Sequence, residues 1–274
     1  MIMELGNVTN SNLELLRRLP PVLRVRDFHL YLEGGRRLTD LWQLGGMAVL
    51  GHKPPKLLKE LKNSAERGLF APFPHPMEKR FLKALARLFP SPQLGFRLYG
   101  SQAALEAALN KAGFSGNNEA HVSLWRPFLN GIFPPEKAEP SLYIPILPWI
   151  FSPQVLILDK SQENCFPQGD LLSPLILAPA TRAIYDLIAA GKDGGRPKYQ
   201  KINKALSKKG CKWQRQGIYF FRIPEAQKNW EPVWEYFLEK GFLLPPSSHE
   251  PLILPGLLSQ GEEKKLADLL EEPA

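Results

Sequence analysis

The sequence predicts an α/β protein built in layers, because short apolar strands alternate with segments that have helical periodicity. The strands are expected at residues 94 to 99, 154 to 158 and 217 to 222, each close to a helix-like segment. With 274 residues, 44% of them hydrophobic, the chain can bury a large core as one compound domain or two modest ones.

Two helices are expected before the first strand, and another is expected at the C-terminus. Residues 54 to 67 and 77 to 89 repeat apolar side chains at helical spacing. Near the C-terminus, Ser259 followed by Glu262 has the form of a capping box at a helix start. Seven prolines among few helix formers instead predict an irregular connection over residues 126 to 153.

Composition narrows the class of protein. The formal charge is +8, and residues 198 to 215 concentrate lysines, but no stacking aromatics alternate with them, so we expect a solvated face and no nucleic-acid partner. No apolar run approaches the 18 or so residues of a membrane span, and the N-terminus lacks a signal-peptide layout. Cys165 and Cys211 share no metal or redox spacing, and the five histidines are scattered. These observations predict a cytoplasmic protein without a disulfide framework or a zinc site.

The turn after the first strand is a candidate phosphate-binding site. Gly100, Ser101 and Gln102 end the strand and open an alanine-rich helix, so backbone N–H groups at the helix N-terminus could hold a phosphate dianion. The same sequence is also explained by a turn of small residues that only packs a helix on a sheet. From the local sequence, the two interpretations stay open.

Lys160 is the candidate catalytic residue. The apolar run from residue 154 delivers its amine to the start of a turn that contains Pro167 and Gly169. A lysine at a strand end is either a surface residue or an amine placed to form an imine with an aldehyde.

Further motifs follow one another in a recognisable order. A glycine turn at residues 34 and 35 leads to a strand that carries Asp40, and Leu50-Gly-His-Lys-Pro54 follows it. Near the C-terminus, residues 241 to 250 are followed by an apolar strand and then by a Glu-rich helix. With the Lys160 segment, these motifs resemble class III pyridoxal-phosphate aminotransferases, the group that contains glutamate-1-semialdehyde aminomutases. The resemblance covers most of residues 20 to 125 and 153 to 272.

The resemblance implies a fold, a cofactor and an assembly. The fold would be a reduced aspartate-aminotransferase-like (fold type I) large lobe with a mostly parallel sheet at residues 51 to 195. A small α+β lobe would come from residues 1 to 50 and 196 to 274. The implied cofactor is pyridoxal phosphate, with Lys160 forming the imine, Gly100, Ser101 and Gln102 holding the phosphate, and His121 near the position of a stacking ring. A surface or loop histidine is the more common explanation of His121. A homodimer and an amino-acid-like substrate are also implied, and Arg182 could bind a carboxylate or pair with Asp186.

Two departures from the family pattern leave two functional hypotheses. The sequence has no aspartate between Asp40 and Asp159, where the family places a carboxylate opposite the ring nitrogen. Only 58 residues separate Ser101 from Lys160, where the family uses roughly twice as many. The first hypothesis is a minimal aminotransferase or aminomutase. The second is a non-catalytic descendant that acts as a dimeric or partner-binding module, with or without the cofactor.

Overall fold

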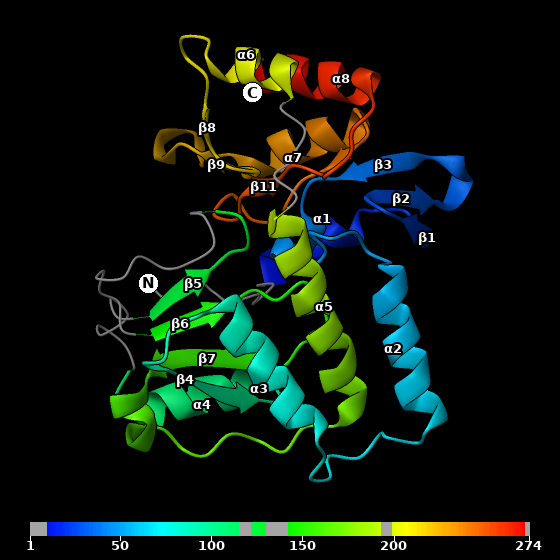
Figure 1. Ribbon diagram of the computed structural model, residues 1–274. Helices are drawn as coiled ribbons and strands as arrows, with labels where there is room; N and C mark the ends of the chain where they lie inside the picture. The colour runs from blue at the N-terminus through cyan, green and yellow to red at the C-terminus, as the bar shows by residue number, and fades with distance from the viewer. Residues whose placement is uncertain (1–9, 115–121, 130–141, 193–198, 272–274) are drawn as a thin grey trace. The chain divides into compact units, whose positions relative to one another are not determined.

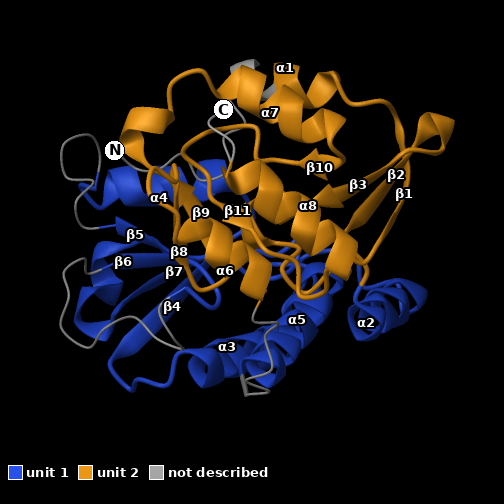
Figure 2. Ribbon diagram, turned by 90° about the horizontal axis from the view of Figure 1, so that it is seen from above, with its two compact units in different colours: residues 1–7, 54–192 blue, residues 8–53, 193–274 orange. Residues whose placement is uncertain are grey.

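The computed structural model describes residues 10–114, 122–129, 142–192 and 199–271. These residues fall into two compact units, which Figure 2 distinguishes by colour. Unit 1 takes its described residues from 54–192, and unit 2 takes them from 10–53 and 199–271. None of the helices in these ranges combines the length and the apolarity that crossing a bilayer requires.

Unit 1 is an α/β unit around a four-stranded sheet in the order β4-β7-β6-β5 (Figure 1). The predicted helices at 54–67 and 77–89 are confirmed as α2 and α3, and the predicted strands at 94–99 and 154–158 as β4 and β7. The elements of unit 1, in chain order, are α2 (Pro55–Glu66), α3 (Met77–Leu88), β4 (Leu94–Tyr99), α4 (Gln102–Lys111), β5 (Val122–Trp125), β6 (Leu142–Pro145), β7 (Gln154–Asp159), the 3-10 helix η4 (Lys160–Cys165) and α5 (Pro174–Lys192).

The strand directions correct one expectation. Strand β7 runs antiparallel to both β4 and β6, and only β5 and β6 are parallel, so the sheet is mixed and not mostly parallel. The prediction failed because an apolar run signals burial on both faces of a strand without signalling the direction of its neighbour. The predicted irregular connection over 126–153 is wrong in part, because residues 142 to 145 form β6. Residues 130–141 lie outside the described residues.

The core of unit 1 lies on both faces of the sheet. Leu156 and Leu158 of β7 pack with Leu105 of α4, and all three are fully buried. The alternate residues of β7 are also fully buried and point to the opposite face, as the period of a strand requires. Helix α5 packs against α2 and α3 (Figure 1), and Phe89, just after α3, meets the ring of Trp125 at 4.9 Å. The ring of Phe89 therefore connects the end of α3 to strand β5.

Unit 2 joins the two ends of the chain. Its first sheet has the order β1-β2-β3-β10, in which β3 and the C-terminal strand β10 are parallel, and its second has the order β11-β9-β8. The predicted small α+β lobe from both termini is thus confirmed. The elements of unit 2 are α1 (Asn10–Arg17), β1 (Val22–Arg26), β2 (His29–Leu32), η1 (Glu33–Gly35), β3 (Arg37–Asp40), η2 (Gln43–Gly46), α6 (Gln200–Leu206), β8 (Trp213–Gln216), β9 (Tyr219–Arg222), η5 (Pro224–Ala226), α7 (Trp230–Glu239), β10 (Phe242–Leu243), β11 (Leu252–Ile253) and α8 (Gln260–Glu271).

The predicted capping box of the last helix is confirmed. The backbone N–H of Glu262 donates to Ser259 Oγ at 3.2 Å, and Glu262 Oε2 accepts from the backbone N–H of Ser259 at 2.9 Å. The other carboxylate oxygen, Oε1, is 2.8 Å from Nε2 of His29 and accepts from Thr39 Oγ1 at 3.1 Å. One side chain therefore begins α8 and attaches it to strands β2 and β3.

These contacts predict a pH-dependent contribution to stability. Burial opposes ionisation and is the largest influence, yet the hydroxyl and N–H of Ser259 and the imidazole of His29 together lower the pKa of Glu262 from 4.5 to about 2. The carboxylate therefore stabilises the fold fully above pH 4.5, and this contribution is lost as the pH falls towards 2. We expect Glu262→Gln to lower the free energy of unfolding by about 2 kcal/mol at pH 7 and by less at pH 3. Urea unfolding of parent and variant at both pH values measures this; an equal difference at both would refute a role for the charge.

Candidate functional site

The Gly100–Gln102 turn forms at the C-terminal end of β4, where the sequence places it. Ser101 is the N-cap of α4, and its Oγ accepts a hydrogen bond from the backbone N–H of Ala104 at 3.1 Å. The backbone N–H of Gly100 donates to Asp170 Oδ2 at 2.8 Å. A helix thus begins at this turn as predicted. However, the carboxylate of Asp170 already accepts from the Gly100 N–H, one of the groups expected to bind a phosphate.

Asp170 is held in place by the residues that precede it. Its backbone N–H donates to the carbonyl oxygen of Leu98 at 2.8 Å, and the hydroxyl of Tyr99 donates to the carbonyl oxygen of Pro167 at 3.4 Å. Gly169 crosses β4 so closely that a Cβ there would lie 2.6 Å from the same Leu98 oxygen. Only a residue without a side chain permits this approach. The position of Asp170 is therefore set by backbone contacts, and no local motif in the sequence marks this residue.

The charges at the turn do not suit a phosphate dianion. Asp170 is one carboxylate beside Gly100, and Gln102 donates to a second one, Glu106 Oε1, at 2.7 Å. An added dianion at the Gly100 N–H would displace Asp170 or lie beside it, and like charges at such distances repel each other. Among the residues described around this turn, the contacts thus favour a helix cap over a cofactor cradle.

Lys160 lies at the opposite end of β4 from this turn, and the expectation that it faces Gly100 was wrong. In the antiparallel pairing of β7 with β4, Asp159 is opposite Leu94 and Gln154 is opposite Tyr99. Lys160 is exposed, and its Nζ donates to the carbonyl oxygen of Pro92 at 2.6 Å. The six residues of β4 separate the two sites, which corresponds to about 20 Å of strand. This exceeds the reach of a lysine side chain.

The other sequence candidates do not complete a site. Arg182 pairs with Asp186, its Nε donating to the two carboxylate oxygens at 3.1 and 3.2 Å, so the pairing interpretation is confirmed. His121 lies outside the described residues. The parts expected to hold pyridoxal phosphate are thus not brought together in the described part of unit 1, and the residues present do not fit that group.

A buried polar cluster in unit 2 explains the motifs around Asp40 and His52. Asp40 is 1% exposed, and its Oδ1 accepts from the backbone N–H groups of Trp42 at 2.8 Å and Gln43 at 2.9 Å. Its Oδ2 is 2.7 Å from Nε2 of His52. Gln43 and Leu44 have φ of 48° and 52°, a left-handed conformation that costs energy for residues other than glycine. The carboxylate therefore holds a strained turn closed.

Sequence comparisons reveal distant relatives that match part of the chain. No family model matches it. An uncharacterized protein of Treponema pallidum is 29% identical over 180 residues, which are 65% of this chain and 56% of that protein. The glutamate-1-semialdehyde 2,1-aminomutase of Thermus thermophilus is 31% identical over 99 residues, 35% of this chain and 23% of the enzyme. The chain therefore spans about half, or less, of the length of these relatives.

Solved structures show the fold more clearly than the sequences do. The ornithine delta-aminotransferase of Plasmodium falciparum superposes with a TM-score of 0.64 at 13% identity, over 96% of this chain and 97% of that one. An omega-transaminase from Sphaerobacter thermophilus gives a TM-score of 0.63 at 12% identity, over 92% and 90% of the two chains. The α/β aminotransferase architecture of fold type I is thereby confirmed. At these identities the similarity concerns the fold alone.

Proposed function

We propose that this chain is a non-catalytic descendant of the aminotransferase fold that acts as a dimeric or partner-binding scaffold. The observation that carries the proposal is the antiparallel pairing of β7 with β4, which leaves Lys160 and Gly100 at opposite ends of a six-residue strand. The alternative, a minimal pyridoxal-phosphate enzyme, needs the amine and the phosphate site to face one pocket. The carboxylate of Asp170 at the Gly100 N–H also argues against that alternative.

The scaffold role is supported by large apolar side chains on the surface of unit 1. Phe70, Phe73 and Phe151 are 60%, 72% and 64% exposed. Aromatic side chains are enriched where proteins bind one another, and exposing them to water is unfavourable. We therefore extend the proposal to association through these residues, with a second copy of the chain as the first candidate.

The proposal is tested by asking whether pyridoxal phosphate forms an imine at one defined lysine. The protein is titrated with the cofactor, reduced with borohydride, and mapped by peptide mass spectrometry. We expect weak labelling spread over several exposed lysines and no saturable aldimine absorbance band from unit 1, because the amine of Lys160 lies at the opposite end of β4 from the Gly100 turn. Light scattering on the same preparation is expected to give at least twice the 31.0 kDa mass of one chain.

Matched lysine variants make the test specific. Lys160→Ala and Lys79→Ala each remove one exposed amine of unit 1, and each is expected to lose only the label at its own position. Stoichiometric, saturable labelling of a single lysine of unit 1, at residue 160 or elsewhere in that unit, would restore the enzyme hypothesis. A monomeric mass in solution would remove the homodimer and leave association with a different protein.

A further inference from the structure

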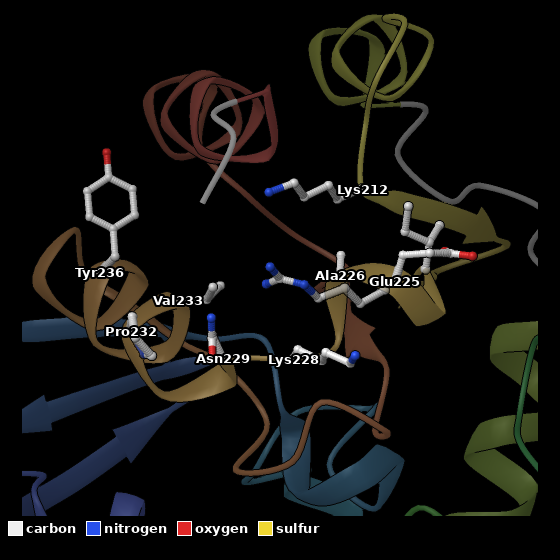
Figure 3. Close-up of a pocket in the computed structure, with 10 residues that line it drawn as sticks. Lys212, Glu225, Ala226, Lys228, Asn229, Pro232, Val233 and Tyr236 are labelled. Carbon is white, nitrogen blue, oxygen red and sulfur yellow. The ribbon is translucent and has the colours of Figure 1, made fainter.

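Unit 2 contains a cavity to which neither the sequence motifs nor the comparison of folds gives a role. It has a volume of about 750 Å³ and opens between η5, α7 and the residues at the ends of the β8–β9 hairpin (Figure 3). Small-molecule sites in proteins typically measure roughly 300 to 1,000 Å³. The cavity is thus large enough to hold a metabolite.

The charged groups at this cavity are mostly cationic. Lys212, Arg222 and Lys228 line it, against a single carboxylate, Glu225. Figure 3 shows the ammonium of Lys212 directed over the space between η5 and α7, whereas the side chain of Glu225 extends away from that space. A concave surface lined by one sign of charge concentrates ligands of the opposite sign.

Arg222 supplies a cation that is already fixed in position. It is 6% exposed, and its guanidinium carbon lies 5.4 Å from the ring centroid of Trp213 and 5.5 Å from that of Trp230. Both distances are within the range of cation–π contacts. The carbonyl oxygen of Arg222 accepts a hydrogen bond from Gln227 Nε2 at 3.3 Å, and this bond holds the turn that follows β9. Burial lowers the pKa of Arg222, so an anion in the adjacent cavity would offset part of the cost of keeping this charge out of water.

The opposite wall provides an amide and an apolar surface. Asn229 is the N-cap of α7 in a left-handed conformation (φ 61°), yet its side chain makes no capping hydrogen bond within the described part of unit 2. Figure 3 shows its amide pointing into the space below Lys212. Val233 and the ring of Tyr236 continue this wall along α7. Polar groups and an apolar surface therefore converge on one volume.

We propose that this cavity binds a small organic carboxylate, held by Lys212, Arg222 and Lys228, with its apolar part against α7. An arginine fork matches the two oxygens of a carboxylate, and the apolar wall favours an organic anion over a bare inorganic one. This site is independent of the proposed loss of aminotransferase chemistry, since every residue in it belongs to unit 2.

The test follows the indole N–H signals of the ¹⁵N-labelled full chain during titration with sodium benzoate at constant ionic strength. We expect saturable shifts of the Trp213 and Trp230 signals, because both rings contact Arg222. Combining Lys212→Gln with Lys228→Gln should raise the dissociation constant about tenfold, as expected for the loss of two ion pairs made by partly exposed lysines. Lys265→Gln, an exposed lysine on α8, should leave it unchanged.

Four outcomes would overturn the proposal. The first is the absence of a saturable shift with benzoate. The second is equal binding of the neutral analogue benzyl alcohol, which would show that the cavity does not select for charge. The third is equal weakening by Lys265→Gln, which would indicate a general effect of net charge. The fourth is tighter binding of inorganic phosphate than of benzoate, which would remove the role of the apolar wall.

Discussion

Asp40→Ala is expected to lower the free energy of unfolding by about 3 to 5 kcal/mol, the largest effect of any substitution considered for this chain. The methyl group leaves the backbone N–H groups of Trp42 and Gln43 and the Nε2 of His52 without their acceptor, in a position that is 1% exposed. The left-handed turn at Gln43 and Leu44 would also lose the bonds that hold it. Denaturant unfolding monitored by tryptophan fluorescence measures the loss.

Two further variants separate the carboxylate's hydrogen bonds from general damage. Asp40→Asn keeps one acceptor oxygen and is expected to cost less than Asp40→Ala. Asp159 also ends a strand and accepts two hydrogen bonds, from the N–H and hydroxyl of Ser161, but it lies nearer the surface. Asp159→Ala is therefore expected to have a much smaller effect. If Asp40→Ala costs no more than Asp159→Ala, the carboxylate does not hold the turn.

Gly169→Ala is expected to lower the free energy of unfolding by about 3 kcal/mol. The new Cβ would lie 2.6 Å from the backbone oxygen of Leu98. Because that atom belongs to the backbone of strand β4, and not to the end of a flexible side chain, the clash can be relieved only by moving the Gly169 segment. Movement of that segment would also weaken the bond from Asp170 N–H to Leu98. Thermal and urea unfolding measure the effect.

Gly261→Ala is the matched control for this substitution. Gly261 lies in α8, and a Cβ there would meet no heavy atom within 4 Å. Alanine is expected to stabilise the helix by about 0.5 to 1 kcal/mol, because glycine loses more conformational freedom on folding. Should Gly169→Ala be tolerated as well as Gly261→Ala, the segment does not lie against β4. The assignment of Asp170 to the Gly100 N–H would then fail with it.

Features set by neighbouring residues were predictable from the sequence. The capping box at Ser259 and Glu262 is a local motif, since only two residues separate its partners and the bonds form within one turn of helix. The helices at 54–67 and 77–89 followed from periodicity in the same way. Strand β6 was missed because Pro145 and the prolines that flank the strand oppose it locally, whereas pairing with β5 and β7 stabilises it in the sheet.

The candidate site shows where local reasoning stops. The sequence predicted that Lys160 lies at the end of a buried strand and that Gly100 to Gln102 open a helix; Lys160 directly follows β7, and α4 begins at Gln102. Their separation depends on the direction in which β7 lies beside β4, which no residue within either strand encodes. Asp170 reaches Gly100 across 70 positions of sequence through backbone contacts of Gly169 and Leu98.

The sequence alone determined which segments are buried, where several helices and strands form, and which motifs resemble aminotransferases, because these depend on the side chains within each segment. The tertiary structure decided which chain ends meet, which carboxylate lies at the Gly100 turn, and where the cationic cavity of unit 2 opens. The physical reason is that a strand exposes identical hydrogen-bonding groups along both edges. The choice of neighbour, and with it the composition of any site, is therefore made by packing of the whole unit.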